Sequence, residues 1–202
     1  MPADWRFARQ PFWLFSHVFA GVVVVSFVAL GLWQLDRLGE RRDANRLIED
    51  RTAEVLDLDT GAIAGLDRST DDGSSLDYQA VVATVRTVES DLGRIVNRSG
   101  NGVAGEHVVA VVELADGTEL AVNRGFLPLV PVIEPDPLPS GPVVVTGWLR
   151  ATVERGWLGA TDDGTGDELP RFDTERVASR LGRDLPPVWL QLDTVDGSVP
   201  SG

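Results

Sequence analysis

The pattern of apolar and polar positions divides the chain into a long apolar stretch near the N-terminus and a polar remainder. The stretch from Gln10 to Leu35 holds 26 residues with no Asp, Glu, Lys or Arg. As a helix rising about 1.5 Å per residue, it is long enough to cross a bilayer core of about 30 Å. Phe12 and Trp13 near one end and Trp33 near the other suit the two membrane interfaces. The apolar run of a signal peptide covers only about 7–15 residues, so we predict a retained membrane anchor.

Helical spacing continues after the anchor and then gives way to turn-forming residues. Leu38, Leu47 and Ile48 fall near helical spacing, with Arg and Glu between them. Residues 57–77 are rich in Asp, Ser, Thr and Gly, which is typical of a loop. The predicted organisation is a short tail with a transmembrane helix at 1–36, a helical extension at 37–56 and a β-rich domain at 57–202.

The rest of the chain alternates short β-branched runs with turns. The runs are typical of strands and cover residues 78–88, 94–97, 107–114, 118–126, 143–150 and 188–192. Asp116-Gly117 predicts a tight two-residue hairpin turn. The glycine-rich segments 99–105 and 154–169 predict loops.

One short helix is predicted inside the β-rich region. Asp173 is a suitable N-cap for a helix from Thr174 to Leu181, and Gly182 is suited to end it. The expected fold class is therefore α+β: an N-terminal transmembrane helix followed by a mainly antiparallel β barrel or sandwich domain with small helices.

Composition excludes several classes of function. The net charge is −13, and from Arg51 onward there are 12 Arg against 25 Asp and Glu. Such a surface repels nucleic acid, so no nucleic-acid partner is expected. The chain has no Cys, which excludes disulfides, thiolate metal sites and Cys nucleophiles within it. No metal site is predicted, because the acidic residues Asp162, Asp163, Asp167 and Glu168 fit no calcium-loop spacing and are typical of a solvated loop.

The two histidines each have two interpretations. His17 lies inside the apolar stretch, where a neutral imidazole is a weak candidate for haem ligation or a hydrogen-bonding group near the interface. His107 begins a predicted strand beside a glycine-rich loop, where a surface or hairpin role is favoured over catalysis. The orientation of the anchor stays open on charge alone, because Arg residues flank it on both sides.

Several motifs in order resemble one protein family. Gly31-Leu32-Trp33-Gln34-Leu35 followed by Arg37 resembles the helix-exit signature of the surfeit-locus-one family of cytochrome oxidase assembly proteins. Val122-Asn123-Arg124-Gly125-Phe126, after the Asp116-Gly117 turn, resembles its second signature. Further matches in the same order are Arg98, Gly105, Gly147-Trp148-Leu149-Arg150 and Trp189. The resemblance runs from about Phe12 to Asp193.

The resemblance implies a function that composition and spacing do not reveal. Such proteins assist maturation of haem–copper cytochrome c oxidase, where haem a meets subunit I, without catalysis of their own. The implied setting is the plasma (inner) membrane of a bacterium, with the β domain on the extracytoplasmic side. The implied partners are cytochrome c oxidase subunits, subunit I foremost, together with the lipid bilayer. The only cofactor expected is transient haem a. The resemblance points to Trp33, Gln34, Arg37, Asn123, Arg124 and Gly125 as partner-binding residues.

Alternatives remain at three points. Trp33, Gln34 and Arg37 suit interfacial anchoring as well as contact with oxidase subunits or haem propionates. A second function is that of a stable accessory subunit of a respiratory cytochrome bc–cytochrome c oxidase supercomplex, and a third is an enzyme that uses His107. The resemblance also implies a second membrane helix after the strand of Trp189, but residues 193–202 contain no apolar run. A single-pass and a double-pass protein are therefore both considered.

Overall fold

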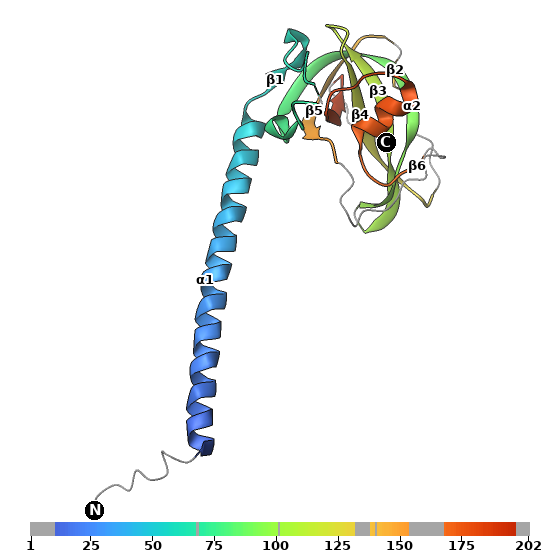
Figure 1. Ribbon diagram of the computed structural model, residues 1–202. Helices are drawn as coiled ribbons and strands as arrows, with labels where there is room; N and C mark the ends of the chain where they lie inside the picture. Colours follow the sequence, from blue (N-terminus) through green and yellow to red (C-terminus); the bar gives the residue numbers. More distant parts are fainter. Residues whose placement is uncertain are drawn as a thin grey trace, which may run out of the picture. The chain divides into compact units, whose positions relative to one another are not determined.

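The computed structural model describes residues 11–67, 69–100, 102–131, 138–139, 141–153 and 168–196. The chain forms two compact units, one up to Leu47 and one from Ile48 onward. The first contains most of the helix α1, which runs from Pro11 to Ala53. The second contains the last turns of α1, all the strands and the helix α2 (Figure 1).

The apolar side chains of α1 are not covered by any other element within the described part of the chain. Its large apolar side chains stay exposed: Phe12 is 80% exposed, Phe15 69% and Leu35 67%. Among the described residues, α1 is the one helix long and apolar enough to span a membrane. Because such a surface is unfavourable in water, it is suited to contact with lipid or with another helix, as the sequence predicts.

Five strands of the second unit form a closed ring. They are β2 (Ala80–Gly100), β3 (Val103–Leu114), β4 (Glu119–Pro128), β5 (Val143–Ala151) and β7 (Val188–Val195). Pairing follows the order β2–β3–β4–β7–β5, and β5 pairs again with β2. β4 and β7 are parallel, and the other ring pairs are antiparallel. This is the strand order of the five-stranded OB-fold barrel. The predicted fold class, a transmembrane-type helix followed by a mainly antiparallel barrel, is confirmed.

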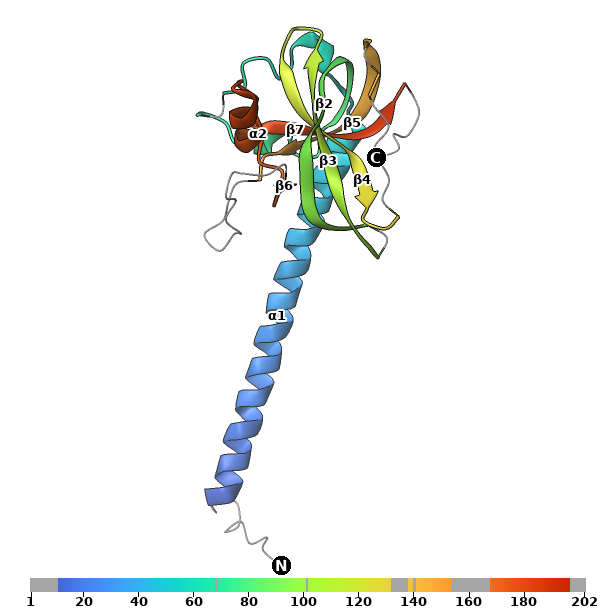
Figure 2. The ribbon, with the colours of Figure 1, turned by 90° about the vertical axis from the view of Figure 1, so that its right-hand side faces the viewer.

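The barrel has one core inside it and a second core on its outer face. Val81, Leu120 and Leu190 belong to the inner core and are at most 2% exposed. The outer core lies where α2 (Thr174–Leu181) packs against the barrel beside β7 (Figure 2). There Val177 of α2 packs in one buried cluster with Trp189. The two-residue strands β1 (Leu56–Asp57) and β6 (Glu168–Leu169) each pair in parallel with β2.

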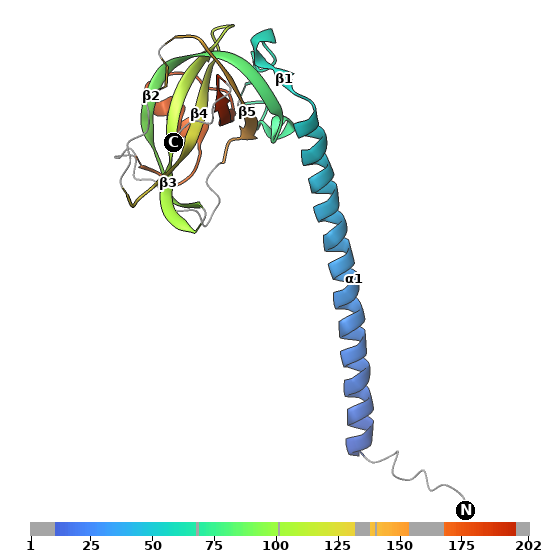
Figure 3. The ribbon, with the colours of Figure 1, turned by 180° about the vertical axis from the view of Figure 1, so that it is seen from behind.

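β2 differs from its prediction. The two short strands predicted at 78–88 and 94–97 are parts of one strand of 21 residues, which curves across the barrel (Figure 3). Its pairing with β3 is irregular between Thr87 and Gly93 and again after Ile95. Such irregularities bend a strand without ending it. They interrupt the alternation of apolar residues, which explains why the pattern indicates two strands.

The predicted loop at 99–105 is also wrong, because Gly105 lies inside β3. A Cβ at this position would lie 2.3 Å from the carbonyl oxygen of Leu127 and 2.3 Å from Cζ of Phe126. The glycine therefore permits close strand packing rather than a flexible loop.

Two local predictions are confirmed. The β3–β4 hairpin turns at Asp116-Gly117, with three turn residues rather than two and with Gly117 at φ 86°. The helix α2 has the predicted bounds, and the Asp173 carboxylate accepts a hydrogen bond from the Arg176 amide at 3.1 Å. Of the predicted loop at 154–169, only Glu168 and Leu169 lie within the described residues, where they form β6.

Candidate functional site

The residues of the first motif form an exposed set on α1. Trp33 is 62% exposed, and Gln34 and Arg37 are exposed as well. Trp33 and Arg37 are four residues apart and therefore lie on one face of the helix. The Arg37 guanidinium donates to the Glu40 carboxylate at 2.7 Å, and both side chains remain more than half exposed. This face offers an aromatic ring and a cation to a partner or to lipid headgroups.

His17 packs against its own helix. Its ring stacks on Trp13 with 4.6 Å between the centroids, and its Nδ1 lies 2.8 Å from the Trp13 carbonyl oxygen. Because a carbonyl can only accept, Nδ1 is the donor in this contact, which in a neutral ring leaves Nε2 as the acceptor nitrogen. The side chain is exposed.

The second motif forms a β-bulge in β4. Val108 of β3 pairs with Gly125 and Val109 pairs with Asn123, so Arg124 is the extra residue. Gly125 has φ 141°, in the region that favours glycine. Asn123 and Arg124 are each only 3% exposed. The two polar side chains of the motif are therefore buried within the domain.

Asn123 joins the bulge to the neighbouring strand. Its Nδ2 donates to Oε1 of Gln191 on β7 at 2.7 Å, and its Oδ1 accepts from the Gly125 amide at 3.1 Å. One amide side chain thus fixes both the bulge and the parallel β4–β7 seam.

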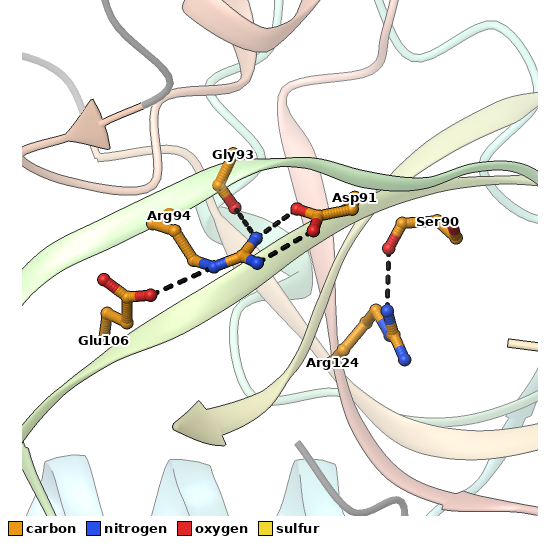
Figure 4. Close-up of polar contacts among 6 residues, drawn as sticks. All are labelled: Ser90, Asp91, Gly93, Arg94, Glu106 and Arg124. Atoms are coloured by element: carbon orange, nitrogen blue, oxygen red, sulfur yellow. Dashed lines mark hydrogen bonds and ion pairs between the residues drawn. The ribbon is translucent and has the colours of Figure 1, made fainter. Parts of the chain in front are cut away.

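Arg124 crosses to the bend of β2. Its guanidinium donates to the Ser90 carbonyl oxygen at 2.8 Å (Figure 4). Ser90 lies within the irregular segment of β2, where regular pairing with β3 is interrupted. Arg124 therefore provides a hydrogen bond to β2 at a point where regular pairing with β3 is interrupted.

A second arginine, not identified from the sequence, secures the same bend. Arg94 donates to the Asp91 carboxylate at 2.8 Å through Nη2, and its Nε lies 3.0 Å from Oε1 of Glu106 on β3 (Figure 4). The hydrogen bond that Arg94 donates to Asp91 is the main factor that raises the pKa of Arg94 above its usual value. The sequence does not indicate which residue a charged side chain on a strand will contact, so this group was not predicted.

His107 makes a structural contact at the same end of the barrel. Its Nδ1 lies 3.2 Å from the Gly125 carbonyl oxygen, and its ring meets Phe126 edge-on at 5.7 Å. Burial is the main factor that lowers the pKa of His107, and the positive charge of Arg98 adds to it. These contacts agree with the predicted hairpin role.

The last turn of α1 is bonded to the segment before β2, within the unit that begins at Ile48. Arg51 donates to the Asp77 carbonyl oxygen at 2.6 Å, and Nε2 of Gln79 donates to the carbonyl oxygens of Arg51 and Glu54. Gln79 thereby satisfies carbonyls that a helix end leaves unpaired.

Arg150 continues this arrangement into the outer core. Its Nε donates to Asp77 at 2.9 Å, and its guanidinium lies 4.0 Å from the centre of the Tyr78 ring. Trp189 stacks on Phe172 with 4.1 Å between the ring centroids, and its indole nitrogen donates to the Ala151 carbonyl oxygen. Arg150 and Trp189, two of the sequence matches, thus meet in one packed column.

The described part of the chain holds no group of three or more His, Asp or Glu suited to a metal ion. Asp162, Asp163 and Asp167 of the predicted acidic loop lie outside the described residues. An open groove of about 730 Å³ lies between residues 63–67, the hairpin turn at Gly117 and residues 183–186. Arg183 and Glu119, which both line the groove, form an ion pair with each other. Because these two charges are paired, the groove does not indicate a particular ligand.

A comparison with known protein families identifies the family of this chain. The family model described as the SURF1 family matches residues 21–200. The match covers the apolar part of α1 from Gly21, both motifs and the whole barrel. No curated protein matches the chain.

Proposed function

Because this chain belongs to the SURF1 family, which is associated with the assembly of cytochrome c oxidase, we propose that it is a membrane-anchored assembly factor of that oxidase. It acts by binding and has no catalysis of its own, in keeping with a family that is generally non-enzymatic. The observation that carries the proposal is the family match over residues 21–200, which includes the anchor helix and the barrel together.

The helix face of the first motif is the proposed contact site in the membrane. Trp33 and Arg37 are exposed on one face, and the apolar residues before them have no partner within the described residues. We propose that a helix of oxidase subunit I packs beside α1, with this face at the membrane boundary. Small residues such as Gly21 and Gly31 lie on other sides of α1, where the absence of a side chain allows close approach of a helix.

Transient contact with haem a would use the same face. A guanidinium pairs with a carboxylate in two-pronged fashion, so Arg37 is suited to a haem propionate and Trp33 to the flat macrocycle. His17 keeps Nε2 available for iron, as its Nδ1 is bonded to Trp13. The β domain is proposed to lie on the extracytoplasmic side of the plasma membrane.

Asn123, Arg124 and Gly125 have a supporting role in this proposal. Because Asn123 and Arg124 are 3% exposed, they act on a partner through the surface whose shape they hold.

The proposal is tested by purifying the tagged native protein in mild detergent and identifying its partners by mass spectrometry. An assembly factor recovers subunit I in small amounts, and deletion of its gene depletes the oxidase. Recovery of oxidase subunits in equal amounts, with haem a absorbance, would instead identify a stable accessory subunit of the supercomplex. Recovery of no oxidase component would contradict both functions.

A further inference from the structure

Three aliphatic side chains lie exposed at one end of the barrel. Val130 is 79% exposed, Leu129 53% and Val103 44%. The Leu129 amide donates to the Ala104 carbonyl oxygen at 3.0 Å, which places the segment after β4 beside the start of β3. We call these three residues the apolar tip. They lie by the hairpin of β2 and β3, whose end projects beyond the rest of the barrel (Figure 3).

The segments that carry the apolar tip contain no acidic residue. Residues 95–105 and 125–131 include neither Asp nor Glu, although 25 acidic residues follow Arg51 in the chain. Their one charged residue is Arg98, whose guanidinium donates to the Pro170 carbonyl oxygen at 3.2 Å. The apolar tip thus lies on two short acid-free segments of a strongly acidic domain, and the next acidic residue on β3, Glu106, is paired with Arg94.

The apolar tip rests on a tightly packed base. The Phe126 ring lies where a Cβ on Gly100 would be 3.2 Å away and one on Gly105 only 2.3 Å away. The absence of side chains at both positions lets the ring lie close to the backbones of β2 and β3. The exposed valines and leucine are therefore presented on a structured support, which lowers the entropy lost on binding.

The chain is long enough for the apolar tip to reach a membrane that holds α1. The 18 helical residues from Asp36 to Ala53 lead about 27 Å away from the apolar stretch. β2 begins beside the end of α1, where Gln79 bonds Glu54, and its 21 residues have a contour length of about 70 Å. Because β2 curves, its contour length is the upper limit of its reach, and this limit exceeds the distance of about 27 Å set by the helix.

We propose that the apolar tip inserts into the interfacial region of the membrane that anchors α1. Anionic headgroups repel the acidic remainder of the domain, so an acid-free apolar surface is the part best suited to approach them. The anchor keeps the bilayer at high effective concentration, so three aliphatic side chains suffice for a contact that would be weak in a free domain. This inference depends on the anchor and not on the identity of the oxidase partner.

The absence of native Cys allows a direct test in the full chain. Val130→Cys is labelled with an environment-sensitive fluorophore and reconstituted into vesicles of phosphatidylcholine and phosphatidylglycerol that contain doxyl lipids. The matched control is Val144→Cys, a 47% exposed position on β5 with the same label. The proposal predicts emission at shorter wavelength and loss of intensity by doxyl quenching at position 130, with neither change at position 144.

A second variant separates insertion from an effect of the label. Leu129→Asp, added to Val130→Cys, removes the quenching, whereas Val153→Asp, at a 49% exposed position elsewhere, leaves it unchanged. Near-ultraviolet circular dichroism checks that both variants keep the barrel. Equal quenching at positions 130 and 144, or none at 130, would overturn the proposal. So would shielding of position 130 that appears only after oxidase is added, because the surface would then bind protein.

Discussion

The two sequence motifs of this SURF1 protein occupy opposite environments. Trp33 of the helix motif is 62% exposed, whereas Arg124 of the strand motif is 3% exposed and bonded to the bend of β2. A family signature can therefore mark a surface that meets a partner or a set of internal bonds that shapes the fold. The comparison predicts that changes in the strand motif and its seams reduce stability, whereas changes in the helix motif affect assembly without affecting stability.

The largest loss of stability is expected at the seam between β5 and β7. A Cβ at Gly147 would lie 2.1 Å from the Gln191 carbonyl oxygen, so Gly147→Ala forces two paired strands apart. We expect it to lower the free energy of unfolding by about 3 kcal/mol, measured by urea unfolding of the full chain in detergent. Gly141→Ala is the control, because nothing lies within 4 Å of its Cβ. Equal midpoints for both variants would contradict the close packing of this seam.

A smaller loss is expected for Arg124→Ala. The substitution leaves the Ser90 carbonyl oxygen without its guanidinium donor at the bend of β2. The expected cost is about 2 kcal/mol, as for a hydrogen bond to a charged group. Arg86→Ala is the matched control, since Arg86 lies on β2, the strand of Ser90, with its side chain 62% exposed, and a change within about 0.5 kcal/mol is expected there. If Arg124→Ala also changed stability by so little, the strand motif would not be structural.

The pH dependence of stability should report His107. Burial lowers its pKa below the ordinary 6.5, so the unfolded chain takes up the proton first as pH falls. The contribution of His107 is fully present above about pH 6.5 and is lost as the pH falls through the lower folded-state value, with a slope of at most about 1.4 kcal/mol per pH unit. His107→Gln should flatten the fall of stability that begins below about pH 6.5. An unchanged profile would argue against burial of a neutral ring.

The smallest change in stability, with the largest change in partner recovery, is expected in the helix motif. Trp33→Ala combined with Arg37→Ala should alter the unfolding of the β domain by less than about 0.5 kcal/mol, because both side chains are exposed. The same variant should no longer recover oxidase subunits in a pull-down. Arg46→Ala, with its side chain 72% exposed on the same helix, should recover them normally. Normal recovery by the double variant would move the contact away from this face.

Local signals predicted the elements whose cause is local. The apolar run predicted the helix, Asp173 and Gly182 predicted the ends of α2, and Asp116-Gly117 predicted the hairpin. The length of β2 could not be predicted, because its bend is held by Arg124 and Arg94 from outside the local segment. The same holds for Gly105, whose packing partner Phe126 lies on another strand.

The residues of the candidate site divide in the same way, into those whose environment follows from local sequence and those whose environment depends on contacts with distant segments. The exposure of Trp33 and Arg37 follows from their position at the end of the apolar stretch of α1. The burial of Asn123 and Arg124 depends on a bulge, which exists only once β3 and β4 are paired, and on Gln191 from a parallel strand far along the chain. The role of Tyr78 under Arg150 had no sequence signal, as it depends on packing between segments 72 residues apart.

The most direct test of the proposed function is the visible spectrum of membranes from cells that lack this chain. The account predicts loss of the haem a signal of cytochrome c oxidase while the b- and c-type cytochromes remain. Re-expression of the native chain should restore the signal, and re-expression of the Trp33→Ala, Arg37→Ala variant should not. Normal haem a content in the deleted cells would contradict a role in oxidase assembly.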